Sequence, residues 1–124
     1  AARSFDPAQA QDERQRMIVY GIPTCDTCKA AIKALTAAGH DVTLRNIRAE
    51  PLTADERAEF ITEFGDRIIN RQSTTWRGLS DWLKASEADA QLEAEPTLMK
   101  RPVIRSKTAL TLGWDAAAQS THLG

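Results

Sequence analysis

The two cysteines of the chain stand three positions apart, in the motif Cys25-Asp26-Thr27-Cys28. Disulfides that stabilise secreted domains join segments that are distant in the sequence, and this pair closes too small a loop for that purpose. The C-x-x-C spacing is instead typical of thiol–disulfide chemistry in a reducing compartment. Structural zinc needs about four ligands, and His40 and His122 do not have the spacing of a zinc finger. We therefore predict a redox motif that holds no metal.

The residues around this motif predict a strand, a tight turn and a helix. Residues 17–20 (MIVY) form a short apolar run, and residues 21–23 (GIP) follow as a turn signal. A helix is expected to begin near Thr24 and Cys25 and to end at Gly39, since glycine is common just after a helix. The cysteines then lie at the junction of a strand and a helix, which makes the C-x-x-C motif more specific.

The expected helix gives the two cysteines different surroundings. Cys28 shares one face with Ile32 and Leu35, so it should point inward, whereas Cys25 should lie at the exposed tip. The nucleophile is a thiolate, and the first turn of a helix favours negative charge. We predict that Cys25 attacks and that Cys28 resolves the mixed species by forming an internal disulfide. An inert, partly buried pair is the alternative. We interpret Lys29 as a solvated side chain, with a role in holding the thiolate charge as the alternative.

The middle of the chain predicts a second strand and a group of helices. Residues 42–47 alternate as a half-buried strand does. Helices are expected to begin at the capping box of residues 53–56, at Thr74-Thr75, and at residues 86–89. The second of these helices carries Trp76, Leu79 and Leu83 at helical spacing. Core packing is a better interpretation of the aromatic residues here than a platform for a ligand.

The end of the chain predicts a hairpin and a terminal helix. Residues 103–105 and 108–112 flank Ser106-Lys107 as two antiparallel strands, and an alanine-rich helix follows. The order is βαβ, a helical insertion, then ββα, which predicts an α/β fold with a small mixed four-stranded sheet. We expect one domain over residues 17–124, and we interpret residues 1–16 as a polar leader with Met17 as an original start.

Composition excludes several classes of function. The chain has 124 residues, 42% hydrophobic and 27% charged, with a net charge of −1. This balance argues against direct binding of nucleic acid, which needs a clustered basic face. The sequence has no run near the roughly 20 apolar residues of a membrane span and no apolar core of a secretory signal. We therefore expect a cytoplasmic protein with neither a nucleic-acid nor a membrane partner.

Arg101 and Pro102 stand just before the third expected strand. Folds of thioredoxin-like order place a cis-proline there, and the cis bond costs only about 0.5–1 kcal/mol relative to trans. Such a bond would aim the backbone at the C-x-x-C turn. An ordinary trans-proline at a strand edge explains the residues equally well, and the sequence leaves the two alternatives open.

Four stretches carry a resemblance to a known family: residues 18–27, 74–77 (TTWR), 100–102 (KRP) and 112–113 (LG). Their order and spacing resemble the arsenate reductase (ArsC) family of the thioredoxin superfamily, in its YffB-like branch. The resemblance implies a thioredoxin-like fold with a helical insertion between the second and third strands. It identifies Cys25 with the catalytic cysteine, and Arg101 with an arginine that precedes the cis-proline and binds an oxyanion.

The sequence departs from arsenate reductases of this type in three places. They use two further arginines, and this chain has Asn70, next to Arg71, where the first would fall. It has no basic residue near Trp114-Asp115, where the last would fall. Cys28 is not needed by glutathione-dependent members. The candidate substrate-binding residues are Arg101, Pro102, Thr24 and Arg71.

The expected function is a thiol-dependent oxidoreductase. Its substrate would be a small oxidised molecule or a glutathionylated one. Glutathione is a candidate cosubstrate, glutaredoxin and thioredoxin are candidate partners, and we expect no bound cofactor. A genuine arsenate reductase is one alternative. The other is a redox-switch regulator similar to Spx, which binds RNA polymerase and uses a C-x-x-C motif as its switch.

Overall fold

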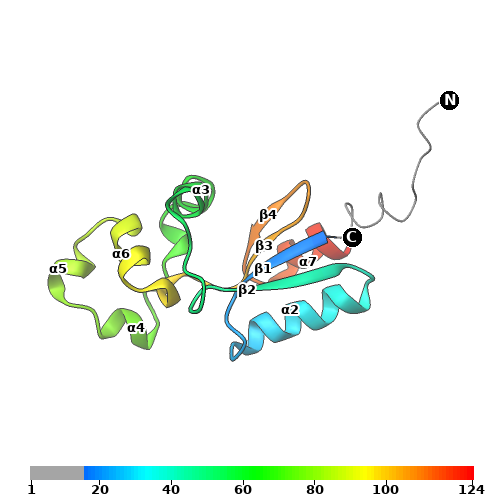
Figure 1. Ribbon diagram of the computed structural model, residues 1–124, viewed down its shortest axis with the longest axis horizontal. Coiled ribbons are helices and arrows are strands. Elements are labelled where there is room, and N and C mark those ends of the chain that lie inside the picture. The colour runs from blue at the N-terminus through cyan, green and yellow to red at the C-terminus, as the bar shows by residue number, and fades with distance from the viewer. Residues whose placement is uncertain (1–15) are drawn as a thin grey trace. The chain divides into compact units, whose positions relative to one another are not determined.

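The computed structural model describes residues 16–124, which form two compact units. Unit 1 consists of residues 16–45 together with Pro102–Gly124, and unit 2 is Asn46–Arg101. Both appear in Figure 1. The expected polar leader lies outside the described residues except for Arg16, which is the first residue of a strand. The single domain expected over residues 17–124 stays a prediction.

Unit 1 is built on a four-stranded sheet with the order β2-β1-β3-β4 (Figure 1). Its elements are β1 (Arg16–Gly21), α2 (Asp26–Ala37), β2 (Asp41–Asn46), β3 (Val103–Arg105), β4 (Leu110–Leu112) and α7 (Ala116–Leu123). The pairs β1–β3 and β3–β4 are antiparallel, whereas β2 returns through the crossover helix α2, which makes its pairing with β1 parallel. The expected α/β thioredoxin-like fold with a mixed sheet is confirmed.

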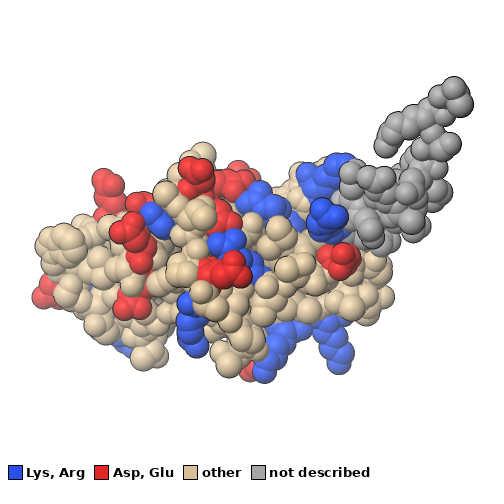
Figure 2. Space-filling view, viewed as in Figure 1, with Lys and Arg blue, Asp and Glu red and all other residues tan. Residues whose placement is uncertain are grey.

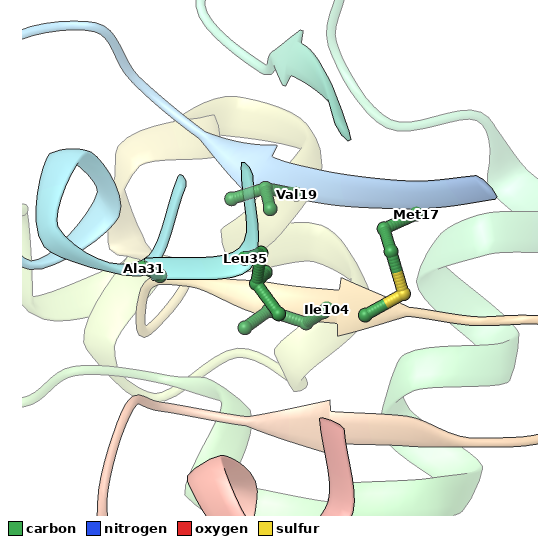
Figure 3. Close-up of a cluster of buried hydrophobic side chains, with 5 residues drawn as sticks. All are labelled: Met17, Val19, Ala31, Leu35 and Ile104. Carbon is green, nitrogen blue, oxygen red and sulfur yellow. The ribbon is translucent and has the colours of Figure 1, made fainter. Parts of the chain in front are cut away.

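A small apolar core fixes α2 against this sheet. Met17 and Val19 alternate on β1 and therefore point to the same face, and Ala31 and Leu35 lie one turn apart on α2. Together with Ile104 of β3 they form one cluster, in which each side chain is at most 1% exposed (Figure 3). This packing holds α2 against β1, with Cys25 just before the first turn of the helix and Cys28 within that turn.

The C-terminal end of α2 is set by Gly39, as the sequence predicts. Gly39 has a φ of 95°, which a residue without a Cβ adopts at little cost. Its N–H donates to the Thr36 carbonyl at 3.0 Å, and the next N–H, of His40, donates to the Leu35 carbonyl at 3.1 Å. These bonds satisfy the last carbonyls of the helix and direct the chain into β2.

Unit 2 is helical. It contains α3 (Ala54–Phe64), η1 (Gly65–Ile68), α4 (Thr74–Arg77), α5 (Asp81–Lys84), α6 (Ala88–Ala94) and η2 (Pro96–Leu98). The predicted capping box is confirmed at α3: the Glu56 N–H donates to Thr53 Oγ1 at 3.1 Å, and the Thr53 N–H donates to Glu56 Oε1 at 2.8 Å. None of the helices in residues 16–124 is long and apolar enough to cross a membrane.

Two buried polar side chains hold the helices of unit 2 together. Arg57 of α3 donates to Asp89 at 2.8 Å and to Glu93 at 3.0 Å, both on α6, and also to the Leu52 carbonyl at 3.1 Å. Gln91 Nε2 donates to three backbone carbonyls near the end of α5, at 3.0–3.2 Å. These polar bonds add to the buried apolar side chains of unit 2, which include Phe60, Ile68 and Leu98.

The single helix expected through Trp76, Leu79 and Leu83 is wrong. The structure has two separate turns, α4 and α5. The Gly78 N–H ends the first by donating to the Thr74 carbonyl at 3.0 Å, and Ser80 caps the second by accepting from the Leu83 N–H at 3.1 Å. Local capping therefore overrides the helical spacing of the three apolar residues, which are only half-buried.

The short helix expected to open at residues 86–89 is α6, and Glu87 is its N-cap residue. One smaller expectation needs correction. The second strand of the hairpin begins at Leu110 rather than at residue 108. The Ser106 N–H donates to the Ala109 carbonyl at 2.9 Å, which makes residues 106–109 a four-residue turn.

Candidate active site at the start of α2

Cys25 is the N-cap residue of α2, with extended backbone angles (φ −81°, ψ 119°). Its N–H donates to the Ile22 carbonyl at 3.2 Å, and its carbonyl accepts from the Lys29 N–H at 3.0 Å. The first bond closes the turn that leaves β1, and the second begins the helix. Cys25 is half-buried, so the residue is partly open to solvent while both bonds hold its backbone.

The N-cap position is electrostatically suited to a thiolate. The first N–H groups of a helix have no acceptor within the helix, and the helix dipole adds a partial positive charge of about half an electron there. Asp26, in the first turn, opposes this effect by like charge. A cysteine at this position is therefore placed to react as an anion.

The charged residues of unit 1 are mostly basic. Its described part carries six basic residues and three acidic ones. The basic residues are Arg16, Lys29, Lys33, Arg45, Arg105 and Lys107, and the acidic residues are Asp26, Asp41 and Asp115. Figure 2 shows basic side chains along α2 and over β3 and β4. The described part of unit 1 therefore has a net positive charge, which favours the approach of an anionic substrate.

Cys28 has a different environment from Cys25. It is completely buried and shares the apolar face of α2 with Ala31 and Leu35. The predicted inward orientation of Cys28 is confirmed, and so is the greater exposure of Cys25. The arrangement pairs an accessible sulfur with a sheltered one a single helical turn away, which is what a dithiol needs in order to attack and then resolve.

Thr24 and Pro102 belong to the same unit as the cysteines. Thr24 is exposed in the turn that precedes Cys25. Pro102 is buried just before β3, and its carbonyl accepts from the Gly113 N–H at 2.7 Å. The antiparallel register pairs Tyr20 with Val103, so the next position of that register places Pro102 opposite Gly21, at the end of β1. The isomer of the Arg101–Pro102 bond stays a prediction.

Arg101 and Arg71 lie in unit 2, so the structure does not join them to the cysteines in one unit. Arg101 Nη1 donates to the Thr97 carbonyl at 2.7 Å, and its Nε is buried with no hydrogen-bond partner within residues 16–124. Arg71 lies 5.4 Å from the centre of the Trp76 ring and 4.0 Å from Asp66. Their predicted role in binding substrate stays a prediction.

A cavity of about 510 Å³ in unit 2 surrounds Arg71. Its lining includes Arg67, Lys100, Asn70 and Asp66. Sequence reasoning missed Arg67 and Lys100, although Lys100 stands in the KRP stretch that carries the family resemblance. Asn70 Oδ1 accepts from the Gln72 N–H at 3.0 Å, so this side chain shapes the turn before α4. Three cations and one carboxylate give the cavity a positive balance.

A second feature that sequence reasoning missed surrounds Tyr20. Arg105 Nε donates to the Tyr20 hydroxyl at 3.1 Å. The guanidinium groups of Arg105 and Arg45 lie 5.7 and 5.9 Å from the centre of its ring. The three residues come from β1, β2 and β3, so only the order of the strands brings them together. Their contacts place two of the cations of unit 1 on the sheet itself.

The fold and the site together define a class of protein. A β2-β1-β3-β4 sheet whose first strand leads into a helix with a C-x-x-C motif is the arrangement of a thioredoxin-fold thiol protein. The model of the ArsC family matches residues 20–121. The chain belongs to the ArsC family.

Solved structures agree with this assignment. The YffB protein superposes with a TM-score of 0.79 at 26% identity, over 87% of this chain and 99% of its own. An arsenate reductase (ArsC) related protein from Brucella melitensis gives a TM-score of 0.66 at 29% identity, over 86% and 93%. The expected relation to the YffB-like branch is confirmed as a structural likeness.

Relatives in sequence belong to more than one functional type. A protein from Haemophilus influenzae, described as uncharacterized, is 36% identical over 102 residues, which cover 78% of this chain and 90% of the relative. The global transcriptional regulator Spx of Listeria innocua is 33% identical over 105 residues, which cover 78% and 79%. Family membership therefore supports a role of the thiol-oxidoreductase type, while relatives of this chain also include regulators.

Proposed function

We propose that the protein is a thiol–disulfide oxidoreductase in which Cys25 is the nucleophile and Cys28 the resolving thiol. The observation that carries the proposal is the pairing of a half-buried N-cap cysteine with a completely buried cysteine in the first turn of the same helix. The N-cap position favours the anionic sulfur. The buried position keeps the second thiol away from external oxidants while it remains close enough to react internally.

The reaction has two balanced steps. The Cys25 thiolate attacks one sulfur of a substrate disulfide, forms a mixed disulfide with it, and releases the other half as a thiolate that takes up a proton. Cys28 then loses its proton and attacks Cys25 Sγ, which releases the second thiol and leaves a Cys25–Cys28 disulfide. Two electrons pass from the dithiol to the substrate. A dithiol protein or two molecules of a small thiol must return them.

The substrate class that we favour is a mixed disulfide of glutathione. Glutathione carries a net negative charge, and the described part of unit 1 carries twice as many basic residues as acidic ones. Arg101, with a buried guanidinium nitrogen not yet engaged within the described residues, is proposed to bind a carboxylate of the substrate, with Thr24, Pro102 and Arg71 as further contacts. Glutathione, glutaredoxin or thioredoxin would supply the electrons.

Arsenate is a less suitable substrate than a mixed disulfide. Asn70 stands where the resemblance expects an arginine, and its side-chain oxygen accepts a backbone N–H of its own turn. The resemblance expects a second arginine near Trp114-Asp115, where the sequence has no basic residue. A doubly charged oxyanion would therefore lack two of the cations that hold it in arsenate reductases.

A redox switch is the second candidate function, and the Spx relatives are the observation that favours it. In that case the same Cys25–Cys28 disulfide would change the affinity for RNA polymerase instead of completing a catalytic cycle. The two functions differ in turnover. An enzyme reduces many substrate molecules per chain when a thiol donor is present, whereas a switch is oxidised once and then binds or releases its partner.

Trapping the mixed disulfide tests the proposal. Cys28→Ser should accumulate one glutathione per chain, attached at Cys25, when it is mixed with a glutathionylated peptide, because the resolving thiol is absent. Cys25→Ser should trap none, and the wild type should show an internal disulfide, with a mass loss of two hydrogens. Wild-type turnover is then measured with arsenate, a glutathione mixed disulfide and insulin, using each of the three thiol donors. Trapping at neither cysteine contradicts the proposal.

A further inference from the structure

Gly21, the last residue of β1, is a glycine for a reason other than backbone freedom. Glycine is required where φ is positive, and Gly39 and Gly113 are such positions, with φ of 95° and 84°. Gly21 is not among the positive-φ residues, so any amino acid could adopt its backbone angles. It is buried within a strand, where glycine usually marks a close approach by a neighbouring group.

The neighbour at Gly21 is Cys28. A Cβ built on Gly21 would lie far inside any permitted contact distance of Cys28 Sγ, and 3.4 Å from Cys28 Cβ. Gly78 provides the contrast, because a Cβ there would meet only the Thr74 and Thr75 carbonyl oxygens, at 3.6 and 3.7 Å, which are ordinary contacts. The buried sulfur of Cys28 therefore occupies the space that a side chain at residue 21 would fill.

Any side chain at residue 21 must displace this sulfur. Cys28 can rotate about its single side-chain torsion, or α2 can move away from β1. Both responses change the position of Cys28 Sγ relative to Cys25, and a disulfide tolerates only a narrow range of Cβ···Cβ distances and torsions. Cys25 itself is tied to the neighbouring residue, since its N–H donates to the Ile22 carbonyl at 3.2 Å.

We infer that Gly21 is a positioning residue for the resolving step. Because Gly21 has no side chain, Cys28 Sγ can occupy the position from which it attacks Cys25. The inference rests on the proposed function for its chemistry, but the contact between Gly21 and Cys28 does not depend on that function. Gly21 touches no substrate and takes no part in the first attack. A substitution there should therefore separate the second step from the first.

The redox test compares Gly21→Ala with the wild type and with Gly78→Ala as the matched control. Each protein is equilibrated with reduced and oxidised glutathione, and the fraction with an internal disulfide is measured by mass. Gly21→Ala should lower the equilibrium constant of the disulfide by about tenfold or more, which is about 30 mV in a two-electron couple. The alkylation rate of Cys25 should stay within about threefold of the wild-type rate, since the N-cap position is unchanged.

The same titration separates failure of the inference from failure of the proposed function. A disulfide constant within about twofold of the wild-type value in Gly21→Ala overturns the positioning role, because a displaced sulfur must change it. A wild-type protein that forms no internal disulfide overturns the proposed function, and the resolving step with it. Gly78→Ala should behave as the wild type does.

A stability cycle keeps the test decisive if Gly21→Ala folds poorly. Cys28→Ala removes the sulfur that a new side chain would meet, so the Gly21→Ala change should lower the urea midpoint much less in that background than in the wild-type background. Gly78→Ala should leave the midpoint unchanged or slightly raised in both backgrounds. An equal loss from Gly21→Ala in the two backgrounds overturns the inference, because the cost then does not come from Cys28 Sγ.

Discussion

Both units of this protein have buried apolar side chains, and unit 2 adds buried polar bonds between its helices. Unit 1 packs α2 on the sheet through a cluster of apolar side chains that are all but inaccessible, with Leu35 at its centre. The redox motif lies in unit 1, at the start of the helix that this cluster packs on the sheet. Two of the helices of unit 2, α4 and α5, have only four residues each and are too short to be stable alone. Besides buried apolar side chains, among them Phe60, Ile68 and Leu98, unit 2 uses side-chain caps and two polar bridges, from Arg57 to α6 and from Gln91 to backbone carbonyls.

The charges of the two units differ as well. Unit 2 carries eleven acidic and eight basic residues, whereas the described part of unit 1 has the opposite balance. Figure 2 shows the acidic side chains gathered over α3, α5 and α6. A thiolate is favoured among cations and disfavoured among carboxylates. The comparison teaches that the cysteines lie on the unit whose charge balance favours a thiolate.

The largest effect that we expect comes from the core of unit 1. Leu35→Ala removes a completely buried side chain and should lower the free energy of unfolding by about 2–5 kcal/mol. Trp82→Ala is the control in unit 2, because this larger side chain is 77% exposed and its loss should change stability by no more than about 0.5 kcal/mol. Urea unfolding measures both. Similar losses in the two variants would contradict the apolar core described for unit 1.

A smaller effect should follow from the polar bridge of unit 2. Arg57→Met keeps most of the buried stem but removes three hydrogen bonds and leaves the Leu52 carbonyl unsatisfied, which should cost about 1–3 kcal/mol. The partner carboxylates of Asp89 and Glu93 are 54% and 70% exposed, so water can solvate them and the loss stays moderate. Arg48→Met, at an exposed position, is the control. An unfolding free energy equal to that of the wild type would show that the bridge contributes nothing.

The smallest effect that we expect is a pH dependence in unit 1. Burial, and secondarily the nearby His40, lower the pKa of His122 below its usual 6.5. His122 Nε2 lies 2.8 Å from Thr111 Oγ1, and His40 Nε2 contacts the His122 carbonyl at 3.1 Å. The unfolded chain binds the proton more readily, so stability should fall as the pH drops below about 6.5.

Urea unfolding at about pH 7.5 and 5.5 checks this direction, since the two values bracket the ordinary histidine pKa. His122→Gln should lose part of the decline that the wild type shows at the lower pH. His40→Gln is the control, because it removes only the secondary cause of the lowered His122 pKa. This variant should retain most of the decline in stability. A decline of equal size in the wild type and in His122→Gln would contradict the assignment to His122.

Much of unit 1 was predictable because its signals are local. The apolar run before Cys25, the spacing of Cys28 and Leu35 and the stop at Gly39 all lie within one strand–helix segment. Periodicity alone therefore predicted both the helix and the burial of Cys28. The capping box at Thr53 was predictable for the same reason, since its two hydrogen bonds join residues three positions apart.

The features that sequence reasoning missed depend on tertiary contacts or on competing local signals. Arg57 is charged and therefore typical of a solvated helix face, and only the packing of α3 on α6 explains its burial. Gly21 meets Cys28 across seven residues, so no pattern in the strand alone indicates the contact. The break between α4 and α5 depends on whether Ser80 caps a new helix or continues the old one, which spacing does not decide.

The central claim is that Cys25 is the reactive thiolate and Cys28 the sheltered partner, and alkylation rates test it most directly. Each thiol is measured alone, Cys25 in Cys28→Ser and Cys28 in Cys25→Ser, with iodoacetamide over a range of pH. We predict that Cys25 reacts faster at every pH and that its rate rises at a lower pH than that of Cys28, because it lies at a helix N-terminus and is more exposed. Faster labelling of Cys28 would contradict the account.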